Sequence, residues 1–102
     1  MLRMLIPVLA IALWSGFAHG QAQPAKTFDA YIIDVEGGEA TLFVSPSGES
    51  MLVDTGWPGF DGRDADRIAA AVRQAGVKQI DYLIVSHFHA DHMGGTAQLA
   101  AF

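Results

Sequence analysis

The sequence lacks cysteine altogether: its 102 residues include four histidines and eleven acidic residues but no thiol. Disulfide bonds are therefore excluded, and so are the thiolate ligands of structural zinc sites. Basic residues are also few, with six lysines and arginines and a formal net charge of −5. Because a chain this acidic gains nothing from attraction to a phosphate backbone, its charge disfavours nucleic acid as a substrate.

The sequence also lacks an apolar run of the ~20 residues needed to span a bilayer. Its N-terminus has one positive charge at Arg3, an uncharged stretch that reaches Phe17 and then Ala18-His19-Gly20. This pattern is typical of a secretory signal peptide over residues 1–20, followed by a linker over residues 21–27. The alternative is a transmembrane anchor, for which the stretch is short. We therefore expect an exported protein, periplasmic or extracellular, with no stable membrane anchor.

The rest of the chain has the pattern of a single α/β domain. Short runs rich in β-branched and aromatic residues predict strands over 28–35, 41–44, 51–53 and 80–85, the last of them buried. Pro46-Ser47-Gly48 predicts a hairpin between the second and third strands. An amphipathic stretch predicts a helix over 61–75, capped by Asp61 or Asp64, and a further helix is expected after Gly95.

Three of the four histidines lie within six positions, directly after the last predicted strand, in Ser86-His87-Phe88-His89-Ala90-Asp91-His92-Met93-Gly94-Gly95. Side chains alternate along an extended segment, so His87 and His89 point the same way and can bind one ion. The turn that must follow brings Asp91 and His92 toward a second position. Imidazole and carboxylate ligands suit zinc in a catalytic role, and iron or manganese could bind there as well.

The cluster has two other interpretations. The histidines could be a chance grouping on a surface loop, but they follow a predicted strand and precede two glycines. They could instead form a tag-like, nickel-binding tract, but Phe88, Ala90 and Asp91 interrupt the spacing. The arrangement therefore favours a metal site.

The residues of the cluster resemble a known signature. Residues 87–92, His-Phe-His-Ala-Asp-His, look like the His-x-His-x-Asp-His motif of the metallo-β-lactamase-fold hydrolases. Residues 51–56, Met-Leu-Val-Asp-Thr-Gly, resemble the strand ending in Asp-Thr-Gly that precedes this motif. Residues 34–40, Asp-Val-Glu-Gly-Gly-Glu-Ala, are similar to the Asp-Val-Gly-Gln-Gly-Asp-Ala segment of the branch with competence-protein (ComEC-type) domains. Glu36, Gly37 and Glu39 depart from that segment.

The resemblance covers residues 28–102 and implies the first half of an αββα sandwich, an α/β fold with a mixed β-sheet flanked by helices. It implies that metal is held by His87, His89, Asp91 and His92, with two zinc ions in the complete enzyme. Asp91 would also help to orient the nucleophile, which makes it the candidate catalytic residue. Asp54 would orient the histidine loop by hydrogen bonding. The alternative for Asp54 is an Asx turn that closes onto Gly56.

Family members complete the site with ligands further along the chain, whereas no histidine follows His92 here. We therefore expect residues 28–102 to be the N-terminal part of a larger enzyme. Its expected reaction is hydrolysis of an ester, amide, lactone or phosphoester in a small-molecule substrate by a zinc-bound hydroxide. Two alternatives stay open: a non-catalytic, truncated zinc-binding protein or pseudoenzyme, and a nuclease of the competence-protein type.

Overall fold

The computed structural model describes residues 24–101. The predicted signal peptide over 1–20, residues 21–23 of the predicted linker and residue 102 lie outside this range, so their prediction stays untested. No helix within residues 24–101 is long and apolar enough to cross a membrane.

A hairpin of two four-residue strands forms the centre of the sheet. β2 (Thr41–Val44) pairs antiparallel with β3 (Ser50–Val53), and Leu42 lies opposite Leu52. Gly48 closes the turn: its amide donates a hydrogen bond to the Ser45 carbonyl at 2.9 Å. Its φ of +93° is one that glycine adopts without steric cost. The hairpin predicted from the Pro-Ser-Gly turn is therefore confirmed.

The two outer strands complete the sheet on either side of this hairpin. β1 (Asp29–Ile32) pairs antiparallel with β2, and β4 (Tyr82–Ile84) pairs parallel with β3, giving the order β1-β2-β3-β4. A parallel neighbour requires a crossover connection, and α1 (Arg63–Gln74) lies within it. The result is a mixed α/β sheet with helices, consistent with the predicted first half of a sandwich.

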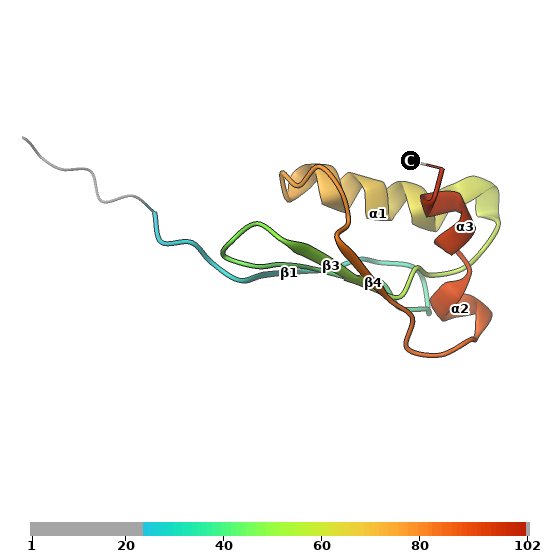
Figure 1. The fold of residues 1–102 in the computed structure, drawn as a ribbon. Helices are drawn as coiled ribbons and strands as arrows, with labels where there is room; N and C mark the ends of the chain where they lie inside the picture. The colour runs from blue at the N-terminus through green and yellow to red at the C-terminus, as the bar shows by residue number, and fades with distance from the viewer. Residues whose placement is uncertain (1–23, 102) are drawn as a thin grey trace, which may run out of the picture.

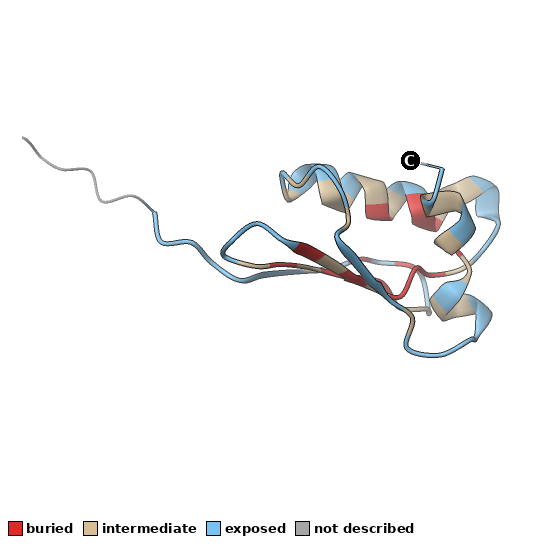
Figure 2. Cartoon of the chain, in the orientation of Figure 1, coloured by how far each residue is buried: buried red, intermediate tan, exposed pale blue. Residues whose placement is uncertain are grey.

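The hydrophobic core lies between α1 and one face of the sheet (Figures 1 and 2). Because residues directly opposite each other in a sheet face the same side, Leu42 and Leu52 point the same way, and they join Ile68 of α1 in one cluster. All three side chains are fully buried, at 0% exposure. Burial of each contributes about 1.5–3 kcal/mol, so this contact holds the helix on the sheet.

The opposite face of the sheet is also apolar, but no helix of residues 24–101 covers it (Figure 1). The strand register places Phe43, Met51 and Tyr82 side by side on this face. All three residues of β4 are exposed, Tyr82 at 57% and Ile84 at 46%. The prediction of a buried strand over 80–85 is therefore wrong for this structure. The physical reason is that β4 is an edge strand with a single neighbour.

The start of α1 also differs from the prediction. A short 3-10 turn, η1 (Phe60–Gly62), precedes it, and no side chain makes a capping hydrogen bond at either element. Asp64, predicted as a possible cap, is instead buried and accepts hydrogen bonds from the Trp57 amide at 2.8 Å and from Arg63 Nε at 2.7 Å. Its carboxylate therefore ties the preceding loop to the helix.

Two one-turn helices follow β4. α3 (Thr96–Leu99) is the helix expected after Gly95, and Leu99 packs against the core. α2 (Ala90–Met93) lies inside the histidine segment and had not been predicted. It converts the extended path after β4 into a turn, so residues that are adjacent in sequence can face the same space.

Candidate metal centre

The predicted site residues lie at the edge of the sheet where β3 and β4 both end. Asp54 directly follows β3, and Ser86 comes two residues after β4. Because the two strands are parallel, their carboxyl ends lie side by side. The Asp54 amide donates a hydrogen bond to the Ile84 carbonyl at 2.8 Å, which extends the strand pairing to this edge. The histidine segment begins here, at the kind of edge where sites form in open α/β sheets.

Asp54 is buried, at 1% exposure, and joins the two strand ends through its carboxylate. Oδ1 accepts a hydrogen bond from the Ser86 amide at 2.7 Å, and Oδ2 accepts one from the Ser86 hydroxyl at 2.6 Å. Oδ2 also lies 2.7 Å from His92 Nδ1. The Gly56 amide does not close an Asx turn with Asp54, because it donates to the Glu39 carbonyl at 2.9 Å. The carboxylate thus contacts the histidine loop at two residues, Ser86 and His92.

The charge on Asp54 is stabilised by these donors. Burial on its own would raise the pKa of Asp54. Hydrogen bonds from the hydroxyl and amide of Ser86 and from His92 outweigh burial and hold the pKa of this carboxyl below its usual range. Asp54 is therefore an anion at neutral pH, and it acts as an acceptor only.

His92 is oriented by this anion. Since Asp54 can only accept, the ring carries its proton on Nδ1, and the lone pair of Nε2 is left to act as a ligand. Nε2 faces Asp91, whose Oδ2 lies 3.6 Å away. The hydrogen bond to Asp54 raises the pKa of His92, and the nearby charges of Asp91, Asp54 and Glu39 add to this effect against partial burial.

His87 and His89 lie beside His92 on the exposed side of the loop. His87 Nε2 is 3.1 Å from His89 Nδ1, and the His87 ring centroid is 4.0 Å from that of His92. His87 Nδ1 lies 2.9 Å from the Ser86 hydroxyl. The structure therefore brings together the four residues predicted from the sequence as metal ligands: His87, His89, Asp91 and His92. Their role as ligands stays a prediction.

The donor set fits the metal that the sequence implies. Two ligand nitrogens on a tetrahedral zinc ion, each at 2.0–2.1 Å, lie about 3.3 Å apart. The 3.1 Å between the facing nitrogens of His87 and His89 is close to that spacing. Within residues 24–101 no group of three or more histidine or acidic side chains is arranged to hold one ion.

Backbone contacts fix the histidine loop to two other segments. The Glu39 amide donates to the Asp91 carbonyl at 3.1 Å, and the Thr55 amide donates to the His92 carbonyl at 2.7 Å. Gly38 permits the first contact, because a Cβ atom at this position would lie 2.2 Å from the Asp91 carbonyl oxygen. The three segments that carry the sequence resemblance, 34–40, 51–56 and 87–92, therefore meet in space.

Two residues of this arrangement were given no role by the sequence. Ser86 links Asp54 to the histidine loop, and a signal for it exists: it follows the strand that pairs parallel with the one ending at Asp54. Glu39 supplies the amide that binds the Asp91 carbonyl, and Thr41 Oγ1 donates a hydrogen bond to its carboxylate. No local pattern indicates that contact, because it joins residues far apart in the chain.

Comparison with known proteins gives one family. A family model described as the metallo-beta-lactamase superfamily matches residues 33–101. This range includes all five residues predicted to form or support the site: Asp54, His87, His89, Asp91 and His92. No solved structure matches the chain.

Curated relatives match over a short part of their own length. A coenzyme F420H₂ oxidase of Methanothermobacter marburgensis is 28% identical over 81 residues, which are 79% of this chain and 17% of that protein. A metal-dependent hydrolase of Staphylococcus saprophyticus is 32% identical over 63 residues, 62% of this chain and 24% of the relative. A metal-dependent hydrolase of Staphylococcus epidermidis matches to the same extent. The chain thus spans about a sixth to a quarter of these relatives.

Proposed function

The chain belongs to the metallo-beta-lactamase superfamily, and from this premise we propose that it carries metal-binding residues of a metal-dependent hydrolase. The proposed metal is zinc, and the proposed substrate is a small molecule with an ester, amide, lactone or phosphoester bond. The similarity to the staphylococcal metal-dependent hydrolases supports this general activity.

One observation carries the proposal: a buried aspartate holds one histidine of a three-histidine cluster. Asp54 contacts His92 Nδ1 at 2.7 Å, which leaves Nε2 as the ligand atom. A carboxylate that fixes the free nitrogen of an imidazole in this way is the usual support of a histidine that ligates metal. A chance cluster of surface histidines would not require this buried partner.

Each residue has a definite part in the proposed reaction. His87 and His89 would hold one ion, and Asp91 and His92 a second. Metal bound there would supply a water of lowered pKa and a Lewis acid for the attacked carbonyl or phosphoryl oxygen. Asp54 keeps the proton of His92 on Nδ1 throughout, and Asp91 orients the nucleophile through its carboxylate.

The test is the metal content and turnover of the complete protein with His87→Ala and with His89→Ala. Each substitution should remove about one equivalent of bound zinc and abolish turnover, because a catalytic zinc needs about three protein ligands. Asp81→Asn, which removes a carboxylate at the opposite end of β4, is the control and should keep both. An unchanged zinc stoichiometry in both histidine variants would contradict the proposal.

The substrate panel separates this function from its alternatives. It should contain a small ester, a lactone, a β-lactam, a phosphodiester and DNA. Cleavage of DNA alone would favour a nuclease of the competence-protein type, although the acidic net charge of the chain opposes it. Zinc binding without turnover of any member would favour the non-catalytic alternative.

Export is a second part of the proposal and rests on residues 1–20. Their single positive charge, uncharged stretch and small residues around position 20 are typical of a cleaved signal peptide. N-terminal sequencing of the protein expressed from its own gene should begin at residue 21. A protein that begins at residue 1 and stays in the cytosol would overturn this part without affecting the metal site.

A further inference from the structure

Glu36 has an unusual backbone conformation for a residue with a side chain. Its φ is +55°, in the left-handed region that glycine adopts most readily. Its amide donates a hydrogen bond to Asp34 Oδ1 at 3.0 Å. A glutamate in this conformation is less stable than a glycine would be. It is also the position at which the similar competence-protein segment has glycine, so the side chain calls for a physical explanation.

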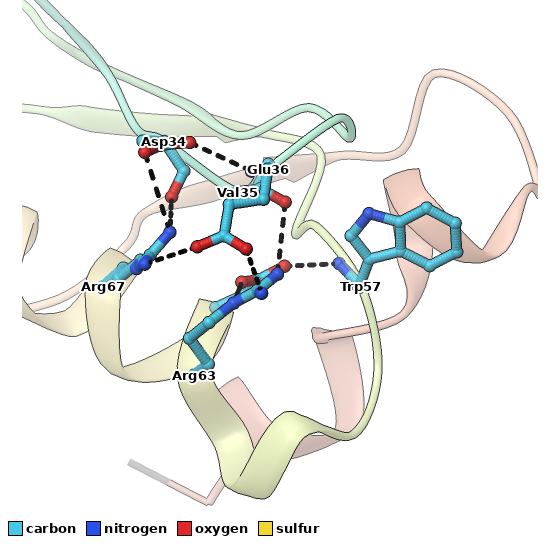
Figure 3. Close-up of polar contacts among 7 residues, drawn as sticks. Asp34, Val35, Glu36, Trp57, Arg63 and Arg67 are labelled. Carbon is cyan, nitrogen blue, oxygen red and sulfur yellow. Dashed lines mark hydrogen bonds and ion pairs between the residues drawn. The ribbon is translucent and has the colours of Figure 1, made fainter.

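The Glu36 carboxylate is bound by two arginines of α1. Oε2 lies 2.7 Å from Arg63 Nη1, and Oε1 lies 2.8 Å from Arg67 Nη2. The arginines are four residues apart and so lie on one side of the helix. Figure 3 shows the carboxylate between them, with one oxygen directed to each.

The same arginines also bind the backbone just before Glu36. Arg67 Nη1 donates to the Asp34 carbonyl at 2.7 Å, and Arg63 Nη2 donates to the Val35 carbonyl at 3.3 Å (Figure 3). We call Glu36, Arg63 and Arg67 the Glu36 clamp. It joins the segment after β1 to the first turns of α1 through both side-chain and main-chain groups.

Global stability does not explain the clamp. The Glu36 side chain, which is common to both ion pairs, is 52% exposed, and those of Arg67 and Arg63 are 36% and 22% exposed. Ion pairs this accessible to water add little to the free energy of folding. The left-handed backbone of Glu36 acts against them. The ion pairs and the left-handed backbone of Glu36 therefore roughly cancel in the free energy of folding. We explain the clamp instead by the loop position that it fixes.

The position fixed is that of the loop beneath Asp91. Two residues after Glu36, Gly38 lies against the Asp91 carbonyl, and the next amide, that of Glu39, donates to this carbonyl at 3.1 Å. Only Gly37 and Gly38 separate the clamp from that amide. A displacement of Glu36 is therefore transmitted over a very short distance to the backbone of a predicted metal ligand.

We propose that Glu36 is a positioning residue, which holds residues 36–39 against Asp91 so that the Asp91 carboxylate is presented to metal. The inference rests on the proposed function for the identity of the ligand. It goes beyond that function by assigning a role to a residue that touches neither metal nor substrate.

The test is Glu36→Gly in the complete protein, with three measurements. Hydrogen exchange of the Glu39 amide in the metal-free protein should become at least about five times faster, because the loop opens more often. Zinc affinity, measured by competition with a chromophoric chelator, should fall about 3- to 10-fold, less than for a residue in direct contact with a ligand. The urea midpoint should stay unchanged or rise, because glycine relieves the backbone cost.

Three internal controls make the result specific. Exchange of the Asp81 amide, which donates to the Ser50 carbonyl at 3.1 Å at the opposite end of the β3–β4 pair, should not change. Glu49→Gln removes a comparable exposed carboxylate at the β2–β3 turn and should leave all three measurements unchanged. Glu36→Gln keeps the length of the side chain and should lie between Glu36→Gly and the wild type.

Two outcomes would overturn the proposal. One is an unchanged rate of exchange at the Glu39 amide in Glu36→Gly. The other is a loss of zinc affinity accompanied by an equal loss of stability, which would assign Glu36 a merely structural part. A wild-type protein that binds no zinc would instead defeat the proposed function, and the exchange data would still decide whether Glu36 fixes the loop.

Discussion

The two ends of the β3–β4 strand pair are joined by the same kind of contact. At the carboxyl end, Asp54 accepts hydrogen bonds from the amide and hydroxyl of Ser86 at 2.7 and 2.6 Å. At the amino end, Asp81 accepts them from the amide and hydroxyl of Ser50 at 2.8 and 3.2 Å. In each case an aspartate on one strand binds a serine on the other, and in each case its pKa is held below the usual range.

The two ends differ in the third partner of the aspartate. Asp81 is exposed, and the side chain of Gln79 donates to it at 2.7 Å, which is the main cause of its lowered pKa. Asp54 is buried and has His92 as its third partner. An aspartate–serine pair therefore joins the two strands at both ends, and only at the carboxyl end does it also support a candidate metal site. The two ends differ because Asp54 is buried and contacts the imidazole of His92, whereas Asp81 is exposed and contacts no histidine.

The largest effect on stability should come from a substitution in the middle of β3, between the two ends. Leu52 lies within β3 and is fully buried, so Leu52→Ala should lower the free energy of unfolding by about 2–5 kcal/mol. Both ends should weaken together, because the strand that joins them is loosened. Urea denaturation measures the stability, and hydrogen exchange of the Ser50 and Ser86 amides reports on each end. Faster exchange at one end alone would show that the ends are not coupled through the strand.

The next largest effect should separate the two aspartates. Asp54→Asn removes the charge that fixes His92 and should weaken zinc binding about 10- to 100-fold. Asp81→Asn, the matched change at the other end, should alter zinc affinity less than about twofold, because it contacts no predicted ligand. Competition with a chromophoric chelator measures both dissociation constants. Equal losses in the two variants would refute the distinction.

Smaller effects are expected from substitution of the two serines, and the property affected should differ: stability for Ser50 and zinc affinity for Ser86. The Ser50 hydroxyl is buried and shares its single proton between the Gln79 carbonyl at 2.7 Å and Asp81 Oδ2 at 3.2 Å. It also accepts a hydrogen bond from the Asp81 amide at 3.1 Å. Ser50→Ala removes the donor to the Gln79 carbonyl, while the Asp81 amide keeps its hydrogen bond to the Ser50 carbonyl at 3.1 Å. The substitution should lower stability by about 0.5–1.5 kcal/mol without changing zinc affinity. Ser86→Ala should affect zinc affinity more than stability. Urea midpoints measure the stability of both variants, and chelator competition measures their zinc affinity. A stability loss larger in Ser86→Ala than in Ser50→Ala would contradict the prediction.

The smallest effect concerns acid stability at the amino end. Because the folded-state pKa of Asp81 is lowered, its contribution to stability is present above the pKa of the unfolded chain and is lost as the pH falls through the folded value. Asp81→Asn should therefore flatten the decline in stability between about pH 5 and pH 2.5. Urea midpoints across this range measure the slope. A slope identical to that of the wild type would mean that the contacts with Gln79 and Ser50 do not persist in solution.

The sequence predicts well what is determined locally. The β2–β3 hairpin follows from two apolar runs around a Pro-Ser-Gly turn, and the histidine cluster is visible because its members are close in the chain. Their meeting with Asp54 was expected only through the family resemblance. The alternation of an extended segment predicts that His87 and His89 point the same way. The structure bends at residues 86–88 instead, and this bend places their nitrogens 3.1 Å apart.

The sequence predicts poorly what depends on distant neighbours. The apolar run 80–85 was expected to be buried, but burial depends on what covers β4, and no local pattern contains that information. Asp64 was expected to cap a helix, because aspartate near a helix start usually does. It binds the Trp57 amide and Arg63 instead, since the loop before α1 folds back onto it. The contact of the Glu39 amide with the Asp91 carbonyl could not be predicted for the same reason.

Gly38 has a consequence for the gene as well as for the protein. Every single-base change that alters the meaning of a glycine codon either stops translation or adds a side chain. At codon 38 that added carbon would lie 2.2 Å from the oxygen of the Asp91 carbonyl. In a library of random point mutants under selection for activity, this codon should be among the most depleted, although residue 38 has no side chain of its own.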